Sequence, residues 1–231
     1  MGATKAQVSY VDQAAVLEPL SEAPALQSDL CLEPHYLFYR FICGQNESGE
    51  DAAAGNAGDD VAAGALPAQY SWTIWRPQTW PTLPPGLSRI RLRRRFLFRW
   101  AISRLHLFGG PDCGALLIYE GGRLAHYSGF TPRYWRFPFI ASGDLQIGDT
   151  WTDPADRGRG LALFALQTIV AAVARPGRRL WYVVEVANKP SIRVAEKAHF
   201  TLAAEGTRVI PWGIKLAGAY VICRNCPSGN N

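Results

Sequence analysis

The sequence predicts an α/β protein in which a mixed sheet is flanked by helices. Several short runs are rich in aromatic residues or alternate between apolar and polar residues, as strands do. Two longer segments instead carry apolar residues at helical spacing. The run Leu180–Val186 is almost continuously apolar, which is typical of a strand in the middle of a sheet. Because helices interrupt the strands, we expect parallel as well as antiparallel pairing.

Before the first predicted helix, two strands are expected at His35–Phe41 and Gln69–Trp75, both rich in aromatic residues. Residues 1–30 are polar and Ala-rich, and we expect them to form a poorly ordered N-terminal extension. Residues 44–67 are rich in Gly, Ala and acidic residues, so they have little to bury and indicate a flexible insert. We therefore expect a single domain over residues 31–231.

The first helix is predicted over Ser88–Phe108, before a pair of glycines. Its apolar face is expected to consist of Ile90, Leu97, Ala101 and Leu105. Arg91, Arg95 and Arg99 lie four residues apart on another face. This arginine stripe is compatible with a solvated face, with a site for an anionic acceptor, or with contact to an acidic membrane surface.

The C-terminal half begins with a predicted meander of three strands, of which the first two are joined by a Glu-Gly-Gly turn. A helix, the continuous apolar strand, a short helix and two further strands follow. Besides Leu180–Val186, the predicted elements are Cys113–Tyr119, Arg123–Ser128, Asp144–Thr152, the helix Gly160–Ala174, the helix Ser191–Ala198, Phe200–Glu205 and Leu216–Cys223.

The composition narrows the possible partners. Apolar residues make up 48% of the chain, enough for a sizeable core. The net charge of the chain is only +5, and residues 89–104 are rich in arginine. This local positive charge favours an anionic ligand over general nucleic-acid binding. No signal peptide is recognisable, and the longest apolar run, Leu161–Ala174, is shorter than the ~20 residues of a membrane span. We expect a soluble, cytoplasmic protein without a transmembrane segment.

The five cysteines are an odd number, which together with the absence of a signal peptide predicts reduced thiols. Cys223 and Cys226 have the spacing of half a zinc site. A structural zinc site needs four ligands, and no second close pair of Cys or His residues completes this one. We therefore expect no metal.

The most informative segment joins the end of a predicted strand to the start of a helix. It contains Gly158 and Gly160, which allow positive φ angles and close approach of a ligand to the backbone. The first N–H groups of the helix have no partner within it, and Arg157 and Arg159 add positive charge. The segment is therefore either a pyrophosphate site or simply a tight turn. Neither a P-loop nor the dinucleotide-binding glycine pattern is present.

Three motifs resemble those of the GNAT acetyltransferases. They are Arg157-x-x-Gly160-x-Ala162, Asn188-x-x-Ser191 and Glu196-Lys197-Ala198-His199-Phe200. The resemblance covers roughly Cys113–Gly206, which would be the CoA-binding core. It implies a sheet with a splayed strand pair, acetyl-CoA as co-substrate, and direct transfer of an acyl group to an amine or hydroxyl. The stretch Leu124–Ala162 is also similar to acetyltransferase-like proteins of bacterial surface-polysaccharide biosynthesis.

The resemblance assigns cofactor contacts to three places in the chain. Backbone groups of Trp151 and Thr152 would pair with the pantetheine arm of CoA where the strands splay. The side chains of Asn188 and Ser191 would contact its far side, although Asn188 is also compatible with a simple turn. The pyrophosphate would be held by backbone N–H groups of Gly158, Arg159, Gly160, Leu161 and Ala162.

Catalytic residues are less well defined. Ala195 stands where many relatives carry a tyrosine that protonates the departing thiolate, so that role cannot be transferred. Gln146 stands where some relatives have a glutamate base, and Gln orients a substrate but accepts no proton. We consider Glu185, Asp144, Asp149 and His126 as candidate bases. Glu185 is expected to be partly desolvated, which would raise its pKa, although a structural role is equally compatible with it. A lone histidine on a strand, such as His126, more often packs than catalyses.

The loop after the second meander strand carries the candidate acceptor-binding residues Arg133, Tyr134, Trp135 and Arg136. These side chains suit a phosphate-bearing sugar or nucleotide sugar, or they anchor a long loop. Two other functions remain open, a non-catalytic acyl-CoA sensor and a peripheral binder of polyanions or membranes that uses residues 88–108. We expect a small-molecule acceptor, no nucleic acid, and a monomer or homodimer.

Overall fold

The structure, a computed structural model, describes residues 35–44, 66–78, 83–87, 90–108 and 110–226. The predictions of a poorly ordered extension over residues 1–30 and of a flexible insert over residues 44–67 fall almost entirely outside these residues.

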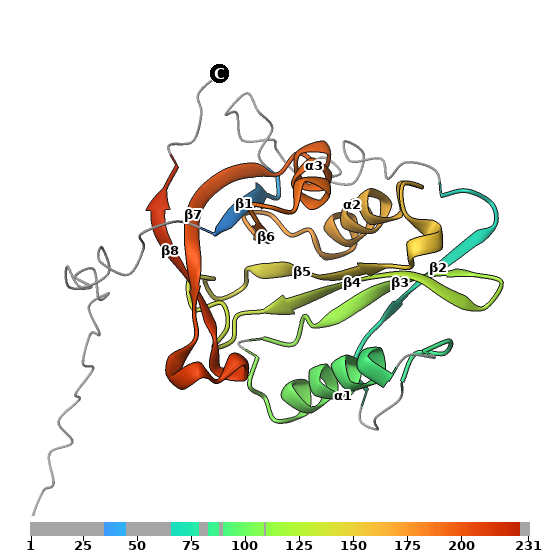
Figure 1. Cartoon of the computed structure of the whole chain (residues 1–231), viewed down its shortest axis with the longest axis horizontal. Coiled ribbons are helices and arrows are strands. Elements are labelled where there is room, and N and C mark those ends of the chain that lie inside the picture. The colour runs from blue at the N-terminus through green and yellow to red at the C-terminus, as the bar shows by residue number, and fades with distance from the viewer. Residues whose placement is uncertain (1–34, 45–65, 79–82, 88–89, 109, 227–231) are drawn as a thin grey trace, which may run out of the picture.

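An eight-stranded mixed sheet runs through the molecule, in the order β2-β3-β4-β5-β6-β1-β7-β8. Helix α1 covers one face, and α2 and α3 cover the other (Figure 1). The prediction of a mixed α/β sheet flanked by helices is confirmed. The elements are β1 (Tyr36–Ile42), β2 (Tyr70–Trp75), α1 (Ile90–Arg104), β3 (Gly114–Glu120), β4 (Arg123–Pro132), β5 (Leu145–Thr152), α2 (Leu161–Val173), β6 (Arg179–Glu185), α3 (Lys189–Lys197), β7 (Thr201–Val209) and β8 (Ala219–Asn225).

Strand β1 lies in the middle of the C-terminal part of the sheet. It pairs antiparallel with β6 on one side and with β7 on the other. Strands β6 and β7 are therefore parallel to each other, linked through α3, with an N-terminal strand between them. The strand itself was predicted from its aromatic pattern, but this position depends on contacts between residues more than 140 positions apart, such as Tyr36 and Glu185.

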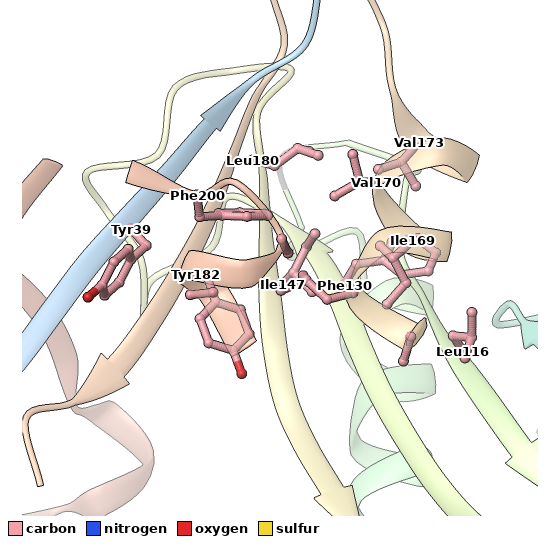
Figure 2. Packing of buried hydrophobic residues seen from close by; sticks show 14 of the residues in the cluster. Tyr39, Leu116, Phe130, Ile147, Ile169, Val170, Val173, Leu180, Tyr182 and Phe200 are labelled. Carbon is pink, nitrogen blue, oxygen red and sulfur yellow. The ribbon is translucent and has the colours of Figure 1, made fainter. Parts of the chain in front are cut away.

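Strands β5 and β6 form the splayed pair. Their parallel pairing extends only from Leu145 opposite Leu180 to Ile147 opposite Tyr182. Asp144 closes this end, because its carboxylate accepts hydrogen bonds from Arg179 N at 3.0 Å and Arg179 Nε at 2.9 Å. Beyond the third pair the two ribbons diverge (Figure 2), which leaves backbone edges of both strands unpaired with each other. The splay predicted from the resemblance is thus confirmed.

An irregularity in β5 lies just where the splay begins. Its register against β4 shifts between the pairs Tyr127–Trp151 and Gly129–Gly148. Asp149, within the shift, has a φ of 51°, a left-handed conformation that is uncommon for a residue other than glycine. The shift is a β-bulge, which re-aims side chains locally and is frequent next to functional sites.

The main core lies between the sheet and helices α2 and α3. Figure 2 shows Ile169, Val170 and Val173 of α2 above Phe130 and Ile147 of the sheet, with Tyr182 and Phe200 beside them. The helix forms there because its apolar residues recur at helical spacing and bury one broad face. Full burial of each such side chain contributes roughly 1.5–3 kcal/mol, so this cluster fixes α2 and the loop that precedes it.

Helix α1 packs through a different face from the predicted one. Leu97 and Leu105, expected in the core, are 41% and 68% exposed, whereas Leu92, Phe96 and Ile102 are buried. Phe96 makes edge-to-face contacts with the rings of Trp75 and Tyr127 beneath it. The aromatic anchor decides the orientation of the helix because it buries more area than any of the leucines. The same rotation turns part of the arginine stripe toward the sheet.

Three further observations bear on the class of protein. Cys43, Cys113 and Cys226 carry free thiols, but Cys223 is disulfide-bonded, so the expectation of reduced thiols fails for this residue. Within the described ranges, no three or more His, Cys, Asp and Glu side chains are grouped to hold a metal ion. No helix in the described part of the chain is long and apolar enough to cross a membrane.

Candidate active site

The loop between β5 and α2 rests on a buried carboxylate. Asp156 ends a short 3₁₀ turn and is only 1% exposed. Its oxygens accept hydrogen bonds from Tyr70 Oη at 2.9 Å and from Arg123 at 2.8 Å. The hydrogen bond from Arg123 holds the pKa of Asp156 below its usual value. Asp156 therefore stays charged and ties the loop to β2 and β4.

The loop ends in two residues with left-handed backbone. Gly158 and Gly160 have φ angles of 77° and 78°, and a Cβ atom at either position would meet nothing within 4 Å. The first hydrogen bond of α2 runs from Phe164 N to Gly160 O, so the preceding N–H groups of the helix have no partner within it. Both glycines are required by conformation, and the space they border is open. This is the geometry of an anion site.

The two arginines of the loop have different surroundings. Arg159 donates to Tyr70 Oη at 2.7 Å and lies 3.6 Å from Glu120 and 3.7 Å from Asp156. Its guanidinium thus belongs to the network behind the loop. Arg157 is exposed and has no ion pair or hydrogen bond within the part of the chain that the structure describes. It is the loop arginine that remains available to an anion.

A ladder of hydroxyl and imidazole groups lies on the α2 side of the sheet. His126 contacts Thr152 Oγ1 through Nδ1 at 2.8 Å and Ser128 Oγ through Nε2 at 2.9 Å. Ser128 Oγ lies 3.0 Å from Thr150 Oγ1. His126 is fully buried, and desolvation lowers its pKa to about 3. The imidazole is therefore neutral at physiological pH. Its Nδ1 links β4 to the end of β5 directly, and its Nε2 contacts Ser128 of β4, which in turn contacts Thr150 of β5.

Tyr182 completes this side of the site. Its hydroxyl lies close to the side chains of Ser191 of α3 and Thr150 of β5, at the splay. In Figure 2 the hydroxyl points away from the apolar cluster that surrounds the ring. Burial raises the pKa of Tyr182, which keeps the phenol protonated. The residue was not predicted from the sequence, because it lies within an apolar run that indicated only a strand.

On the opposite face of the sheet, a cavity of about 450 Å³ opens beside the splay. Its walls come from α1, the loop after β4, β5, β6 and the segment that ends in β8. One wall is apolar and aromatic, and the other carries most of the charge. The lining residues are Arg94, Arg95, Phe98, Arg99, Ile102, Phe108, Thr131, Tyr134, Arg136, Phe137, Gln146, Asp149, Val183, Leu216 and Tyr220.

Asp149, on the bulge of β5, organises the charged wall. Its carboxylate lies 2.6 Å from Arg95 and 3.3 Å from Arg99. Arg95 also donates to Tyr127 Oη at 2.7 Å, and Arg99 donates to the carbonyl oxygens of Gly114 and Phe130. These two members of the predicted stripe therefore pair at the cavity wall, where the side chain of Arg99 is 11% exposed and that of Arg95 is still 54% exposed.

The three predicted catalytic residues are not brought together. Gln146 is buried at the cavity wall, where its Nε2 donates to Ile147 O at 2.8 Å. His126 lies in the ladder on the other face of the sheet. Glu185 ends β6 opposite Tyr36 and is not among the residues that line the cavity. It is exposed rather than partly desolvated, because β6 ends there at the surface.

The predicted acceptor-binding and cofactor-binding residues also lie in different places, some at the cavity wall and some outside it. Tyr134 and Arg136 line the cavity, whereas Arg133 is exposed outside its wall. The ring of Trp135 lies at the rim, where Nε1 donates to Leu216 O at 3.1 Å. Asn188 caps α3, since its Oδ1 accepts from Ser191 N at 3.2 Å.

The backbone of Trp151 and Thr152 lies along the diverging part of β5, beyond its last pair with β6. Sequence reasoning did not identify Val183 and Tyr220 as cavity residues, because no local pattern distinguishes them from other strand residues.

The chain is similar to a known protein family and to several solved structures. The model of the acetyltransferase (GNAT) family matches residues 72–200, more than half of the chain. No curated protein matches the chain significantly.

Solved structures with a similar arrangement include a GNAT-family protein from Novosphingobium aromaticivorans, with 16% identity, coverage of 74% of this chain and 61% of that one, and a TM-score of 0.41. A GCN5-related N-acetyltransferase from Kribbella flavida has 14% identity, coverage of 74% and 55%, and a TM-score of 0.41. The protein yncA from Salmonella typhimurium, solved with its cofactor acetyl-CoA, has 20% identity, coverage of 59% and 76%, and a TM-score of 0.37. The chain thus spans less than two thirds of the first two proteins.

Proposed function

The chain belongs to the GNAT acetyltransferase family, and from this premise we propose that it transfers an acetyl group from acetyl-CoA to the amine, or hydroxyl, of a small acceptor. One observation carries the proposal. An open, glycine-lined helix N-terminus and a cavity of about 450 Å³ lie on opposite faces of the sheet, at the two sides of one strand splay. The splay is where a thioester and an acceptor would meet.

The chain's residues suit CoA on structural grounds. Backbone N–H groups of Gly158–Ala162 would hold the pyrophosphate, with Arg157 as the free charge nearby. The backbone of β5 at Trp151 and Thr152, which lies beyond the last pair with β6, would pair with the amides of the pantetheine arm, as one strand pairs with another. Ser191, beside the Tyr182 hydroxyl, would face the arm from α3. Bound acetyl-CoA would supply the thioester, and no resident metal is invoked.

The acceptor would lie in the cavity, with Gln146 and Asp149 facing it across the splay. Asp149 would accept a hydrogen bond from the ammonium group of the acceptor. A water molecule would remove one proton from this ammonium before the amine attacks the thioester. The amine lone pair then bonds to the thioester carbon, the carbon–sulfur bond breaks, and the nitrogen gives its extra proton to solvent as the neutral amide forms. Tyr182 would give its phenolic proton to the departing sulfur and regain one through solvent. The proton donor would then be Tyr182 of β6, in place of a tyrosine on α3, where this chain has Ala195.

His126 and Glu185 take no proton in this scheme. The low pKa of His126 means that it binds a proton weakly at neutral pH, so it positions β5 through its hydrogen bonds. Glu185 lies outside the cavity wall. Among acceptors, an amino sugar or nucleotide sugar would place its polar groups against Arg136 and its ring against Tyr134.

The test is release of free CoA thiol from acetyl-CoA against amino sugars, nucleotide sugars, amino acids and peptides. We expect release that depends on one acceptor class and is lost in Gly160→Trp, whose indole would fill the pyrophosphate site. Gly177→Trp is the matched control, because Gly177 has a similar φ of 73° and equally open surroundings far along the chain from the loop. It should keep full turnover.

A non-catalytic acyl-CoA sensor is the alternative, and Ala195 in place of a tyrosine is the observation that favours it. Such a protein would bind acetyl-CoA in a way that Gly160→Trp abolishes, yet release no thiol with any acceptor. Absence of acetyl-CoA binding by the unmodified chain would reject both functions.

A further inference from the structure

We propose that the acceptor carries an anionic group, a phosphate or a carboxylate, and that Arg136 with Arg94 holds it. The inference deepens the proposed function, since it takes the cavity beside the splay to be the acceptor site. It starts from the charge of the walls. Four arginines and one carboxylate line the cavity, a formal excess of three positive charges. A concave site lined by one sign of charge concentrates ligands of the opposite sign.

Two of these arginines already have partners. Arg95 and Arg99 both bind the carboxylate of Asp149, and both make further hydrogen bonds to the protein. The attraction of Asp149 raises the pKa of Arg95, which reflects a satisfied pair. Asp149 therefore neutralises one of the two charges of this pair, and Arg136 and Arg94 carry two of the three excess positive charges.

Arg136 and Arg94 have no such partner. Within the described residues, neither guanidinium forms an ion pair or donates a hydrogen bond to another group. Nε of Arg136 is buried and unbonded, which is unusual because buried polar groups nearly always have a partner. The covered Nε is closed to a ligand, but the two Nη groups are neither buried nor hydrogen-bonded among the described residues. An oxyanion in the cavity would bind these Nη groups, because the planar guanidinium fork matches a carboxylate or phosphate in bidentate geometry.

The position of Arg136 is fixed before any ligand arrives. Its carbonyl oxygen accepts a hydrogen bond from Tyr220 N at 2.9 Å, which ties the loop to β8. The neighbouring ring of Phe137 stacks on Tyr220 with 5.1 Å between centroids and 4° between planes. Tyr134 packs edge-to-face against Phe137. These aromatic contacts hold the loop that carries Arg136 in place at the cavity wall.

The test compares amines that differ only in their second group. Ethanolamine, β-alanine and O-phosphoethanolamine present a hydroxyl, a carboxylate and a phosphate, and glucosamine with glucosamine 6-phosphate forms a larger pair. Binding is measured by calorimetry at low salt in the presence of CoA. We expect the anionic members to bind at least about tenfold more tightly than the neutral ones. The carboxylate and phosphate arms identify which anion is preferred.

Arg136→Gln should weaken binding of the carboxylate and phosphate amines to about the level of the neutral ones, while acetyl-CoA binding, on the other face of the sheet, stays unchanged. Arg104→Gln is the matched control, since Arg104 is an exposed arginine of α1 outside the cavity wall. Equal binding of neutral and anionic amines, no binding by any of them, or an equal loss for all in Arg136→Gln would overturn the proposal. Charge-selective binding without thiol release would instead reject the proposed function and leave the anion site standing.

Discussion

The two faces of the sheet build their sites from different parts of the chain. On the α2 face, the candidate CoA site consists of a few consecutive backbone groups, the left-handed Gly158 and Gly160 among them, and of one strand edge. On the α1 face, the candidate acceptor cavity is made of side chains from five separate segments. The first site depends on local conformation, whereas the second depends on how distant elements pack.

This difference has a consequence for ligand choice. A site made of N–H groups and open glycines recognises a generic feature, such as a pyrophosphate, and needs few particular side chains. A site made of side chains is selective because each contributes its own charge or shape. Changes on the α1 face should therefore alter which acceptor binds, and changes on the α2 face should alter whether CoA binds or reacts at all.

The largest effect on turnover is expected from Tyr182, a side chain with a proposed catalytic role on the α2 face, which otherwise uses backbone groups. Tyr182→Phe removes the proposed proton donor and should lower kcat by roughly 100-fold, the lower range for loss of a general acid. The KM for acetyl-CoA should change little, because the ring stays in place. Tyr119→Phe is the control, since the Tyr119 hydroxyl donates to Pro85 O away from the splay. An unchanged kcat in Tyr182→Phe would mean that Tyr182 donates no proton and that the α2 face contributes only backbone groups.

Features of the fold that depend on local sequence could be predicted, whereas features that depend on packing between distant segments could not. Every strand and helix of the C-terminal half was predicted to within a few residues, because periodicity and turn residues are local signals. The α2-face loop was found for the same reason. Three features depend on packing between distant segments. They are the place of β1 between β6 and β7, the rotation of α1 onto Phe96, and the position of the Tyr182 hydroxyl near Ser191 and Thr150. No local pattern carries that information.

The second prediction concerns the ladder that holds β5, and it is a pH effect on stability. The pKa of His126 is about 3 in the folded protein and ~6.5 in an unfolded chain, so the unfolded state binds more protons between these values. Stability contributed by this group is therefore present above pH 6.5 and is lost as the pH falls. Between pH 7 and pH 5 the loss should be about 2 kcal/mol.

Urea unfolding at each pH measures this loss, with His126→Gln as the reference because Gln does not titrate. The wild-type protein should lose about 2 kcal/mol more than the variant over the same interval. Parallel curves for the two proteins would mean that His126 is hydrated, and the ladder would then be no rigid support for the strand edge.

The smallest effect should come from the two loop arginines, which separate side-chain from backbone contributions on the α2 face. Arg157 is exposed without a partner among the described residues, so Arg157→Ala should weaken acetyl-CoA binding only about threefold to tenfold and leave Tm unchanged. Arg159 binds Tyr70 behind the loop, so Arg159→Ala should lower Tm and weaken binding less.

Calorimetry at low and high salt distinguishes these roles, because screening should erase the Arg157 effect but not the conformational effect of Arg159. The loss in Arg157→Ala should remain far below that in Gly160→Trp, since the helix N–H groups persist in the alanine variant. A loss of comparable size would mean that the pyrophosphate is held chiefly by this side chain. The α2 face would then select its ligand through side chains, as the α1 face is proposed to do.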